Sequence, residues 1–242
     1  MLNIVIPMAG RGSRFQEAGY AFPKPLIDVR GKTMIEVVVE NLRPKVPHRF
    51  IFICQREHYE KYDLYNILKK ATNNQFEVVQ ISGITEGAAC TVLTAAKYID
   101  SADDLVIANS DQFIDGGIGA FLAKAQSGGD GLIMTFPASH PKWSYARVDK
   151  DGRVIEVAEK KVISDHATVG VYYYKHGSDF VHGAQEMIKK NIRHNNEFYV
   201  CPVYNELLLA GKKIGIYEIS ADEMHGLGTP EDLEAFLKSS SS

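Results

Sequence analysis

Five apolar runs in the first part of the chain are bounded by turn residues and have the length of β-strands. They are LNIVIP (2–7), RFIFIC (49–54), FEVVQI (76–81), DLVIAN (104–109) and GLIMTF (131–136). Such runs are typical of strands buried on both faces, as in a parallel sheet. The segments between them, 33–42, 57–71, 87–99 and 118–126, carry apolar residues at helical spacing. The pattern predicts an α/β fold, with a Rossmann-like, doubly wound and mostly parallel sheet flanked by helices.

The pattern changes after Pro137, where the apolar runs become short and partly alternate with polar residues. Segments 145–149 and 153–159 flank the turn KDG, which predicts a β-hairpin, and 167–175 is expected to be a further strand. The remaining expected elements are helices at 177–192 and 201–211, a strand at 212–219 and a final helix beginning at Pro230. We therefore expect a smaller, mixed-sheet lobe in this half of the chain.

These elements fit a single domain. The chain has 242 residues, of which 45% are hydrophobic, enough for one sizeable core and too few for two ordinary ones. We expect the domain to cover residues 1–238, with a first part over 1–136 and a second part, which includes the C-terminal helix, over 137–238. The serines at 239–242 are a low-complexity tail.

Composition narrows the functional classes. The formal net charge is −3, so the basic excess that sequence-independent binding to nucleic acid demands is missing. No basic segment precedes the first strand pattern, and no uncharged apolar run has transmembrane length, so we expect a cytoplasmic protein without a membrane partner. Cys54, Cys90 and Cys201 lack CxxC spacing and predict inert thiols rather than a disulfide framework or a zinc site.

The decapeptide IPMAGRGSRF overlaps and follows the end of the first expected strand. In an open α/β sheet, ligands bind beyond the carboxyl ends of the strands. Gly10 and Gly12 let backbone amides approach an anion, and Arg11 and Arg14 carry charge that does not titrate near neutral pH. Phosphate is therefore the expected ligand. The segment is not a Rossmann GxGxxG fingerprint, which would need glycine at Phe15, and the chain has no Walker A loop.

A series of further motifs extends this pattern along nearly the whole chain. In order, the motifs are PMAGRGSRF, PKPLIDV, GKTMIE, TEGAACTVL, ANSDQF, EVAEKK, ATVGVYYYK and GLGTPEDLEAF. Together they resemble the sugar nucleotidyltransferase superfamily. The resemblance implies a GT-A-like nucleotidyltransferase fold and a Mg²⁺-dependent reaction, in which a phosphorylated acceptor attacks the α-phosphorus of a nucleoside triphosphate and pyrophosphate leaves. It also implies that the first part of the chain binds the nucleotide and the second part the acceptor.

By this resemblance, Arg14, Lys24 and Lys160 are expected to be the catalytic cations. Arg14 and Lys24 would contact the triphosphate as pyrophosphate leaves, and Lys160 would meet the acceptor phosphate. The chemistry needs little proton transfer, because a phosphate monoester is already an anionic nucleophile. The expected nucleotide-binding residues are those of the glycine-rich loop, the PKPL motif, the TEGAAC segment and the fourth strand end: Met8, Ala9, Gly10, Gly12, Ser13, Arg14, Lys24, Thr85, Glu86, Gly87, Ala88 and Ser110.

Asp111 follows the apolar run DLVIAN, so its carboxylate should emerge at the same sheet edge as the glycine-rich loop. The resemblance assigns this residue to Mg²⁺, an ion that prefers a few carboxylates together with phosphate and water oxygens. The same resemblance places Glu159, Lys160, Gly170 and Val171 at the acceptor.

The chain departs from the family at Gly226, where members commonly carry an aspartate that completes the metal site. Asp222, Glu223 and His225 are nearby candidates for a replacement ligand. Otherwise Asp111, phosphates and water would hold the metal. The missing acid also leaves open whether the acceptor is an ordinary sugar 1-phosphate.

Three functions remain open at this point. The first is a nucleotidyltransferase that makes an activated precursor for a surface polysaccharide. TEGAACTVL and GLGTPEDLE resemble capsule-type cytidylyltransferases, which favours CTP as the donor and admits phosphoglutamine or phosphocholine, beside a sugar phosphate, as the acceptor. The second is a nucleotide-sugar sensor without transfer activity, and the third is a GT-A glycosyltransferase. The sequence decides neither the base, nor the acceptor, nor whether the protein is a homo-oligomer.

Overall fold

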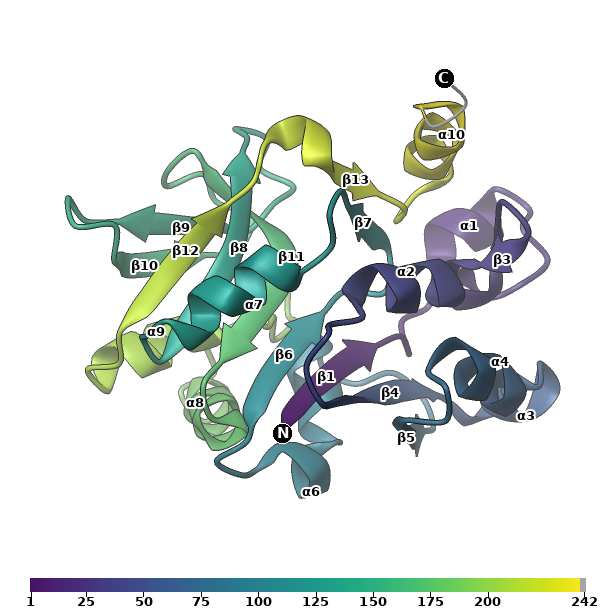
Figure 1. Ribbon diagram of the computed structural model, residues 1–242, viewed down its shortest axis with the longest axis horizontal. Coiled ribbons are helices and arrows are strands. Elements are labelled where there is room, and N and C mark those ends of the chain that lie inside the picture. Colours follow the sequence, from purple (N-terminus) through teal and green to yellow (C-terminus); the bar gives the residue numbers. More distant parts are fainter. Residues whose placement is uncertain (240–242) are drawn as a thin grey trace.

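The computed structural model describes residues 1–239, which form a mixed β-sheet with helices on both faces (Figure 1). Within these residues the central sheet has nine strands, seven of them in the order β10-β9-β11-β6-β1-β4-β5, with β8 and β12 joined through β11. The four strands from β5 to β6 run parallel, and β11 is antiparallel to β6. The strands are β1 (Leu2–Pro7), β4 (His48–Gln55), β5 (Phe76–Ile81), β6 (Asp104–Ala108), β8 (Gly131–Pro137), β9 (Tyr145–Val148), β10 (Val154–Ala158), β11 (His166–Tyr174) and β12 (Ile214–Glu218).

The helices cover both faces of this sheet. They are α1 (Ser13–Glu17), α2 (Met34–Leu42), α3 (Arg56–Lys61), α4 (Leu64–Ala71), α5 (Ala88–Leu93), α6 (Ala96–Ile99), α7 (Gly119–Gln126), α8 (Gly177–Lys189), α9 (Val203–Leu209) and α10 (Pro230–Ser239), with short 3₁₀ turns η1 (Lys24–Leu26) and η2 (Ala221–Glu223). None of the helices within residues 1–239 is long and apolar enough to cross a membrane.

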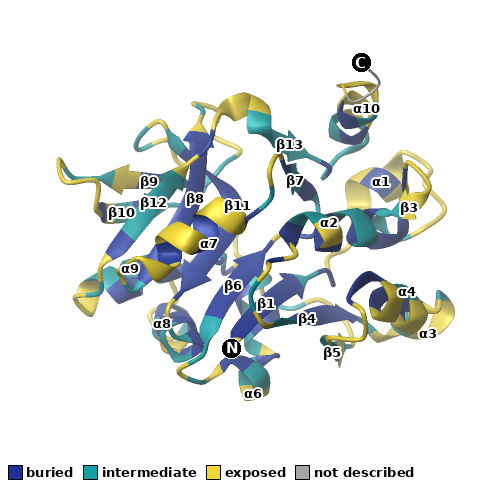
Figure 2. Ribbon diagram, in the orientation of Figure 1, coloured by how far each residue is buried: buried dark blue, intermediate teal, exposed yellow. Residues whose placement is uncertain are grey.

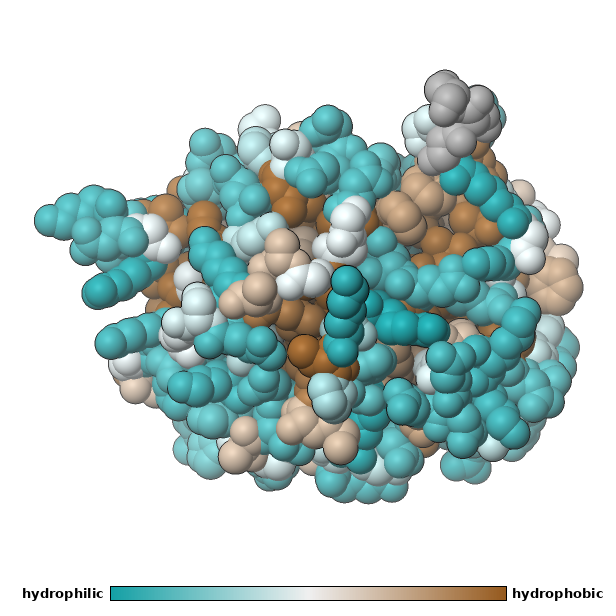
Figure 3. All heavy atoms as spheres, in the orientation of Figure 1, coloured by the Kyte–Doolittle hydropathy of each residue, from teal (hydrophilic) through white to brown (hydrophobic). Residues whose placement is uncertain are grey.

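Two apolar cores lie on opposite faces of the sheet. One contains the buried side chains of α2, α4, α7 and α10, and the other contains those of α5, α6, α8 and α9. The strands are buried where they pass between these layers, while the outer sides of the helices are exposed (Figure 2). On the face seen in Figure 3, apolar atoms show mainly in the hollows between hydrophilic surface groups. The arrangement confirms the predicted doubly wound α/β fold.

The strands after Pro137 extend the central sheet. β11 pairs with β8 along one edge. Along its other edge, Val171–Tyr174 of β11 pair with β6, and Ala167 of β11 pairs with β9. β9 and β10 form the predicted hairpin, and β12 runs parallel to β8. The mixed part of the fold is therefore continuous with the parallel part. Of the serine tail, Ser239 ends α10 and residues 240–242 lie outside the described part of the chain.

Two segments that the sequence predicts as single helices are broken. Segment 57–71 divides into α3 and α4 at Asp63, whose backbone is left-handed with φ 50°. Segment 87–99 divides into α5 and α6, because the Thr94 hydroxyl donates to the Thr91 carbonyl at 2.6 Å and the Ala95 amide donates to the Val92 carbonyl at 2.9 Å. These tighter i to i−3 bonds end the α-helical ladder.

The cysteines are buried or half-buried free thiols in the described residues, as the sequence predicts. Burial raises the pKa of the Cys54 thiol to about 12 and raises that of Cys201 well above its usual value. Neither thiol is therefore a thiolate nucleophile near neutral pH.

Two short ribbons were not expected from the sequence. β2 (Asp28–Val29) and β3 (Lys32–Thr33) form a hairpin before α2. β7 (Gln112–Ile114) and β13 (Met224–Gly226) pair although they are far apart in the chain (Figure 1). The second ribbon is held to α2 by the Asn41 side-chain amide, which donates to the Ile114 carbonyl at 2.7 Å and accepts from the Ile114 amide at 3.0 Å. A single side chain on α2 thus fixes the ribbon next to Asp111.

We predict that Asn41→Ala lowers the free energy of unfolding by about 1–3 kcal/mol, because the buried Ile114 amide loses its partner and the Ile114 carbonyl keeps only the bond from the Gly117 amide. Urea unfolding measures this loss. Asn66→Ala is the matched control, since the Asn66 amide only contacts the exposed carboxylate of Asp63, and it should shift the midpoint little. Equal shifts for the two variants would contradict the clamping role of Asn41.

Candidate functional site

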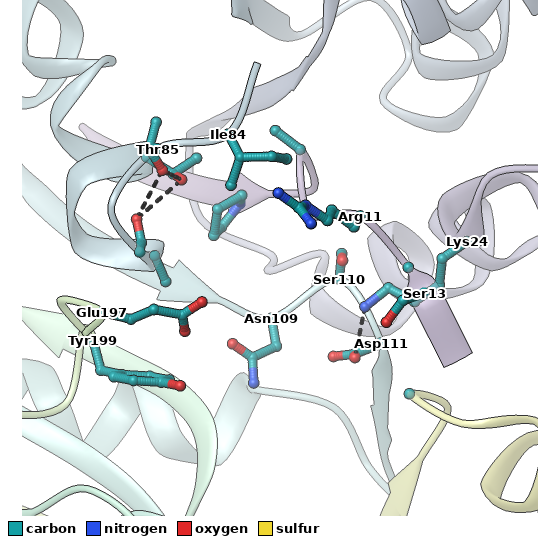
Figure 4. Close-up of a pocket in the computed structure, with 18 of the residues that line it drawn as sticks. Arg11, Ser13, Lys24, Ile84, Thr85, Asn109, Ser110, Asp111, Glu197 and Tyr199 are labelled. Carbon is teal, nitrogen blue, oxygen red and sulfur yellow. Dashed lines mark hydrogen bonds and ion pairs between the residues drawn. The ribbon is translucent and has the colours of Figure 1, made fainter. Parts of the chain in front are cut away.

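A cavity of about 730 Å³ opens at the carboxyl ends of β1 and β6, where the sequence analysis expects a ligand (Figure 4). Its walls come from the first glycine-rich loop, the PKPL motif, the TEGAAC segment, the end of β6 and two later segments. The lining residues are Pro7, Ala9, Gly10, Arg11, Gly12, Ser13, Arg14, Lys24, Ile81, Ile84, Thr85, Gly87, Ala88, Thr91, Asn109, Ser110, Asp111, Glu197, Tyr199 and Gly228.

The first glycine-rich loop leaves the sheet directly after β1. The Met8 amide donates to the Ile53 carbonyl at 2.9 Å, and the Gln55 side chain donates to the Ala9 carbonyl at 2.7 Å, so the start of the loop is tied to β4. Gly12 is left-handed (φ 62°) and precedes α1. The Met8 side chain is buried in the core, so this predicted nucleotide-binding residue could face a ligand only through its backbone.

Three cations, Arg11, Arg14 and Lys24, and two carboxylates, Asp111 and Glu197, line the cavity. The guanidinium of Arg11 points into it between Ile84 and Ser110 (Figure 4), and Arg14 lines it from the first turn of α1. The Lys24 ammonium donates to the Asp111 Oδ2 at 2.8 Å, and both side chains are about three-quarters buried. Pro23, with φ −54°, and the η1 turn fix the backbone that carries Lys24. The structure therefore brings Lys24, predicted to bind the triphosphate, into contact with Asp111, predicted to bind the metal.

The segment after β13 closes the cavity beside Asp111. The Leu227 amide donates to the Asp111 carbonyl at 2.8 Å, and a Cβ at Gly228 would lie 2.7 Å from the Asp111 Oδ2. Glycine at 228 is therefore required by close approach to the carboxylate. At Gly226, where the resemblance leads us to expect an acid, a Cβ would lie 3.4 Å from the carboxylate carbon of Asp232.

The three candidate replacement ligands do not line this cavity. The His225 Nε2 lies 3.2 Å from the Asp115 Oδ2, and the Glu223 carboxylate accepts a hydrogen bond from the Ser220 amide at 2.7 Å. Asp222 is exposed on η2. Among the lining residues, Asp111 and Glu197 are the carboxylates, and Asp111 is the one paired with Lys24, which is predicted to bind phosphate.

The TEGAAC segment forms the opposite wall, held by residues from late in the chain. Gly87 has φ 128°, and a Cβ there would lie 2.5 Å from the backbone nitrogen and oxygen of Phe198. The Phe198 amide donates to the Glu86 carbonyl at 2.8 Å, and the Ala89 amide donates to the Phe198 carbonyl at 2.9 Å.

The Glu86 side chain turns away from the cavity and pairs with Arg193 at 2.7 Å. Thr85, Gly87 and Ala88 line the cavity as expected, whereas the side chain of Glu86 does not.

None of the four predicted acceptor residues lines the cavity itself, and Lys160 reaches it through Tyr199. Lys160 Nζ donates to the Tyr199 hydroxyl at 2.8 Å, and Tyr199 lines the cavity. Burial raises the pKa of the neighbouring Glu159 carboxyl, while a hydrogen bond from Ser144 and the charge of Lys160 oppose the shift.

Gly170 and Val171 have different surroundings. The Gly170 carbonyl accepts from the Asn109 amide, and a Cβ at Gly170 would lie 2.2 Å from the Asn109 side-chain nitrogen. Glycine at 170 therefore leaves room for the side chain of Asn109, which lines the cavity. The Val171 side chain is fully buried in the core.

Several lining residues were not found from the sequence. Asn109 stands beside Ser110 in the ANSDQF motif, so its position after β6 could have pointed to it. Glu197 and Tyr199 reach the cavity only because segment 193–199 folds over the TEGAAC segment, and no local pattern signals that contact. The other unexpected lining residues are Pro7, Ile81, Ile84, Thr91 and Gly228.

A model of the family described as nucleotidyl transferase matches residues 4–211. The chain belongs to the nucleotidyl transferase family. This confirms the superfamily that the motifs predict. Among curated relatives of this nucleotidyl transferase chain, the bifunctional protein GlmU of Buchnera aphidicola is 28% identical over 211 residues, which cover 84% of this chain and 42% of the relative. The low-salt glycan biosynthesis nucleotidyltransferase Agl11 of Haloferax volcanii is 25% identical over 242 residues, covering 95% and 63%. The chain thus spans less than two thirds of the length of these relatives.

Solved structures share the fold of this nucleotidyl transferase over nearly its whole length. The nucleoside-diphosphate-sugar pyrophosphorylase of Vibrio cholerae superposes with a TM-score of 0.82 at 28% identity and covers 97% of this chain and 99% of its own. The inositol-1-phosphate CTP transferase of T. maritima superposes with a TM-score of 0.71 at 13% identity, covers 99% and 97% of the two chains, and shows the fold alone.

We predict that Gly87→Ala destabilises this nucleotidyl transferase by about 2 kcal/mol or more, since the new methyl group meets the Phe198 backbone in a strained conformation. Urea unfolding gives the loss, and nucleotide titration should show weaker binding. Gly119→Ala is the control, because its Cβ meets nothing within 4 Å and its φ is ordinary. An unfolding midpoint for Gly87→Ala equal to that of Gly119→Ala would show that segment 193–199 does not hold the wall closely.

Proposed function

We propose that the protein is a Mg²⁺-dependent nucleotidyltransferase. It transfers a nucleoside monophosphate, with CTP as the favoured donor, to a small phosphorylated acceptor and releases pyrophosphate. The product would be an activated precursor for a surface polysaccharide. The observation that carries the proposal is the convergence of Arg14, Lys24 and Asp111 beside a glycine-rich loop, with Lys160 bonded to the opposite wall of the same cavity.

The cations would act by binding and orienting two polyanions. Arg14 and Lys24 supply fixed positive charge where negative charge accumulates on the leaving pyrophosphate. Lys160 approaches from the other wall and would hold the acceptor phosphate. The acceptor is already an anionic nucleophile near neutral pH, so the protein needs no general base and its main task is alignment.

The residues beside Asp111 fit a magnesium ion. The donor set is one carboxylate next to phosphate-binding groups, and Mg²⁺ is usually held by one or two carboxylates together with substrate phosphates and water. Asp111 already faces a cation, the Lys24 ammonium at 2.8 Å. When bound, the ion would neutralise phosphate charge and polarise the α-phosphate. Asp111 would hold it, and Lys24 would then be free to turn to the triphosphate.

Two other functions share parts of this site. A nucleotide-sugar sensor would use the same cavity without transfer, and the glycine at 226 in place of an acid favours it. A GT-A glycosyltransferase would also use a strand-end aspartate. Pyrophosphate distinguishes the three functions. A nucleotidyltransferase releases it from a nucleoside triphosphate, whereas the sensor and the glycosyltransferase do not.

The deciding experiment incubates the protein with Mg²⁺, each of the four nucleoside triphosphates and a panel of acceptors, and measures pyrophosphate. The panel holds sugar 1-phosphates, inositol 1-phosphate, phosphocholine and phosphoglutamine. We expect release with at least one pair, and the most with CTP. Nucleotide binding without release from any pair would favour the sensor.

We predict that Arg14→Ala and Lys24→Ala each lower kcat/KM by roughly 10²-fold or more, as removal of a preorganised charge does elsewhere. Their unfolding midpoints should stay close to that of the parent, because both side chains lie at the cavity rather than in the core. Lys69→Ala, on the exposed side of α4, is the control and should keep full activity. A variant at either position with parental turnover would remove that residue from the site.

Asp111→Asn should keep the fold and nearly abolish transfer, since the side-chain size is preserved while the metal-binding charge is lost. Mn²⁺ binding in the presence of nucleotide, followed by electron paramagnetic resonance, gives a readout besides activity and should weaken strongly. Asp115→Asn changes an exposed acid of the adjoining ribbon that pairs with His225, so it should bind Mn²⁺ like the parent. Undiminished Mn²⁺ binding in Asp111→Asn would show that the metal lies elsewhere.

A further inference from the structure

The side chain of Lys160 is held from two directions. Its backbone is left-handed (φ 50°) at the end of the hairpin strand β10, and its amide donates to the Trp143 carbonyl at 3.1 Å. Its Nζ donates to the Tyr199 hydroxyl at 2.8 Å and lies 4.8 Å from the centre of the Tyr199 ring. A lysine ordinarily loses much rotamer entropy when it is fixed on a ligand. In this structure the Lys160 side chain is already held by Tyr199, so it would lose less rotamer entropy on binding a ligand.

Tyr199 belongs to segment 193–199, which is bonded to the predicted nucleobase wall. The two backbone bonds of Phe198 to Glu86 and Ala89 run along this wall, and the Arg193 guanidinium pairs with Glu86 and lies 4.1 Å from the centre of the Phe198 ring. In Figure 4, Tyr199 and Glu197 lie across the cavity from Lys24 and Asp111. The segment therefore fixes Tyr199 relative to the nucleotide pocket.

The phenol of Tyr199 is suited to holding an ammonium near neutral pH. Burial, followed by the hydrogen bond to Glu197 and the charges of Glu197 and Glu159, raises the pKa of Tyr199 well above its usual value. The hydroxyl therefore stays protonated near neutral pH, and its oxygen accepts from the Lys160 ammonium. Tyr199 thus links Lys160 to the cavity wall.

We propose that Tyr199 is a positioning residue, which holds the Lys160 ammonium at the cavity wall so that it meets the phosphate of the acceptor opposite the bound triphosphate. The inference rests on the proposed function of Lys160. It adds that the acceptor lysine is placed by the same segment that supports the nucleobase wall. Tyr199 acts through Lys160 and need not touch either substrate.

The test is Tyr199→Phe, which keeps the ring and removes only the hydroxyl. With pyrophosphate release as the assay, we expect kcat/KM for the acceptor to fall by roughly 10-fold, as for a lost hydrogen bond to a charged group. The kcat/KM for the nucleoside triphosphate, measured at saturating acceptor, should change by less than about 2-fold. Tyr65→Phe, on the exposed surface of α4, is the control and should match the parent. An unchanged acceptor kcat/KM, or equal losses for both substrates, would overturn the proposal.

A double variant separates positioning from a direct role. In a Lys160→Met background, Tyr199→Phe should cause no further loss for the acceptor, because the hydroxyl no longer has an ammonium to hold. A full additional loss would show that Tyr199 acts on its own and would overturn the proposal.

A second measurement does not depend on turnover. In competitive labelling with acetic anhydride, the acetylation rate of Lys160 relative to exposed Lys161 is read by mass spectrometry. Tyr199→Phe should raise this ratio several-fold, because the ammonium loses its partner. An unchanged ratio would overturn the positioning role. If no acceptor supports pyrophosphate release, the proposed function fails, whereas this ratio still reports whether Tyr199 holds Lys160.

Discussion

The parallel pairing of β1 with β6 determines where the chemistry of this protein lies. Val5 is opposite Ile107, so both strands end at the same level of the sheet edge. The glycine-rich loop leaves after β1 and the Asn109-Ser110-Asp111 segment leaves after β6, and the two therefore emerge side by side. Both strands are buried between two apolar layers, so a slip by one residue would exchange the side chains that pack into the two cores. The cavity is thus a consequence of core packing.

Once the two loops are adjacent, the opposite charges that they carry meet. The Lys24 and Asp111 side chains form an ion pair that bridges 87 positions of sequence. A partly buried pair of this kind contributes little net stability, since desolvation offsets much of the attraction. The pair keeps both side chains ordered in the cavity. Under the proposed function, the triphosphate would attract the lysine and the metal ion would attract the aspartate.

The sequence analysis correctly predicted those parts of the structure that are marked by a local sequence pattern. Unbroken apolar runs gave the buried strands, helical spacing gave α2, α7 and α8, and Pro230 marked the start of α10. The loop after β1 and Asp111 followed from the rule that ligands bind at the carboxyl ends of strands. The breaks at Asp63 and Thr94 were missed because a single backbone conformation or hydroxyl bond ended a helix that the apolar spacing would have continued. Glu197 and Tyr199 were missed because only tertiary folding brings segment 193–199 to the cavity.

Segment 193–199 contacts both the predicted nucleotide-binding part and the predicted acceptor-binding part of the site. Residues 1–136 were expected to bind nucleotide and the later residues to bind acceptor, yet Phe198 supports the wall at Gly87 while its neighbour Tyr199 holds Lys160. Movement of this segment cannot displace one contact without disturbing the other, since the two residues are adjacent in the chain. The wall beside the predicted base and Lys160, which is predicted to meet the acceptor phosphate, are therefore mechanically linked. Substitutions in 193–199 that alter the choice of nucleotide would then alter the placement of the acceptor as well.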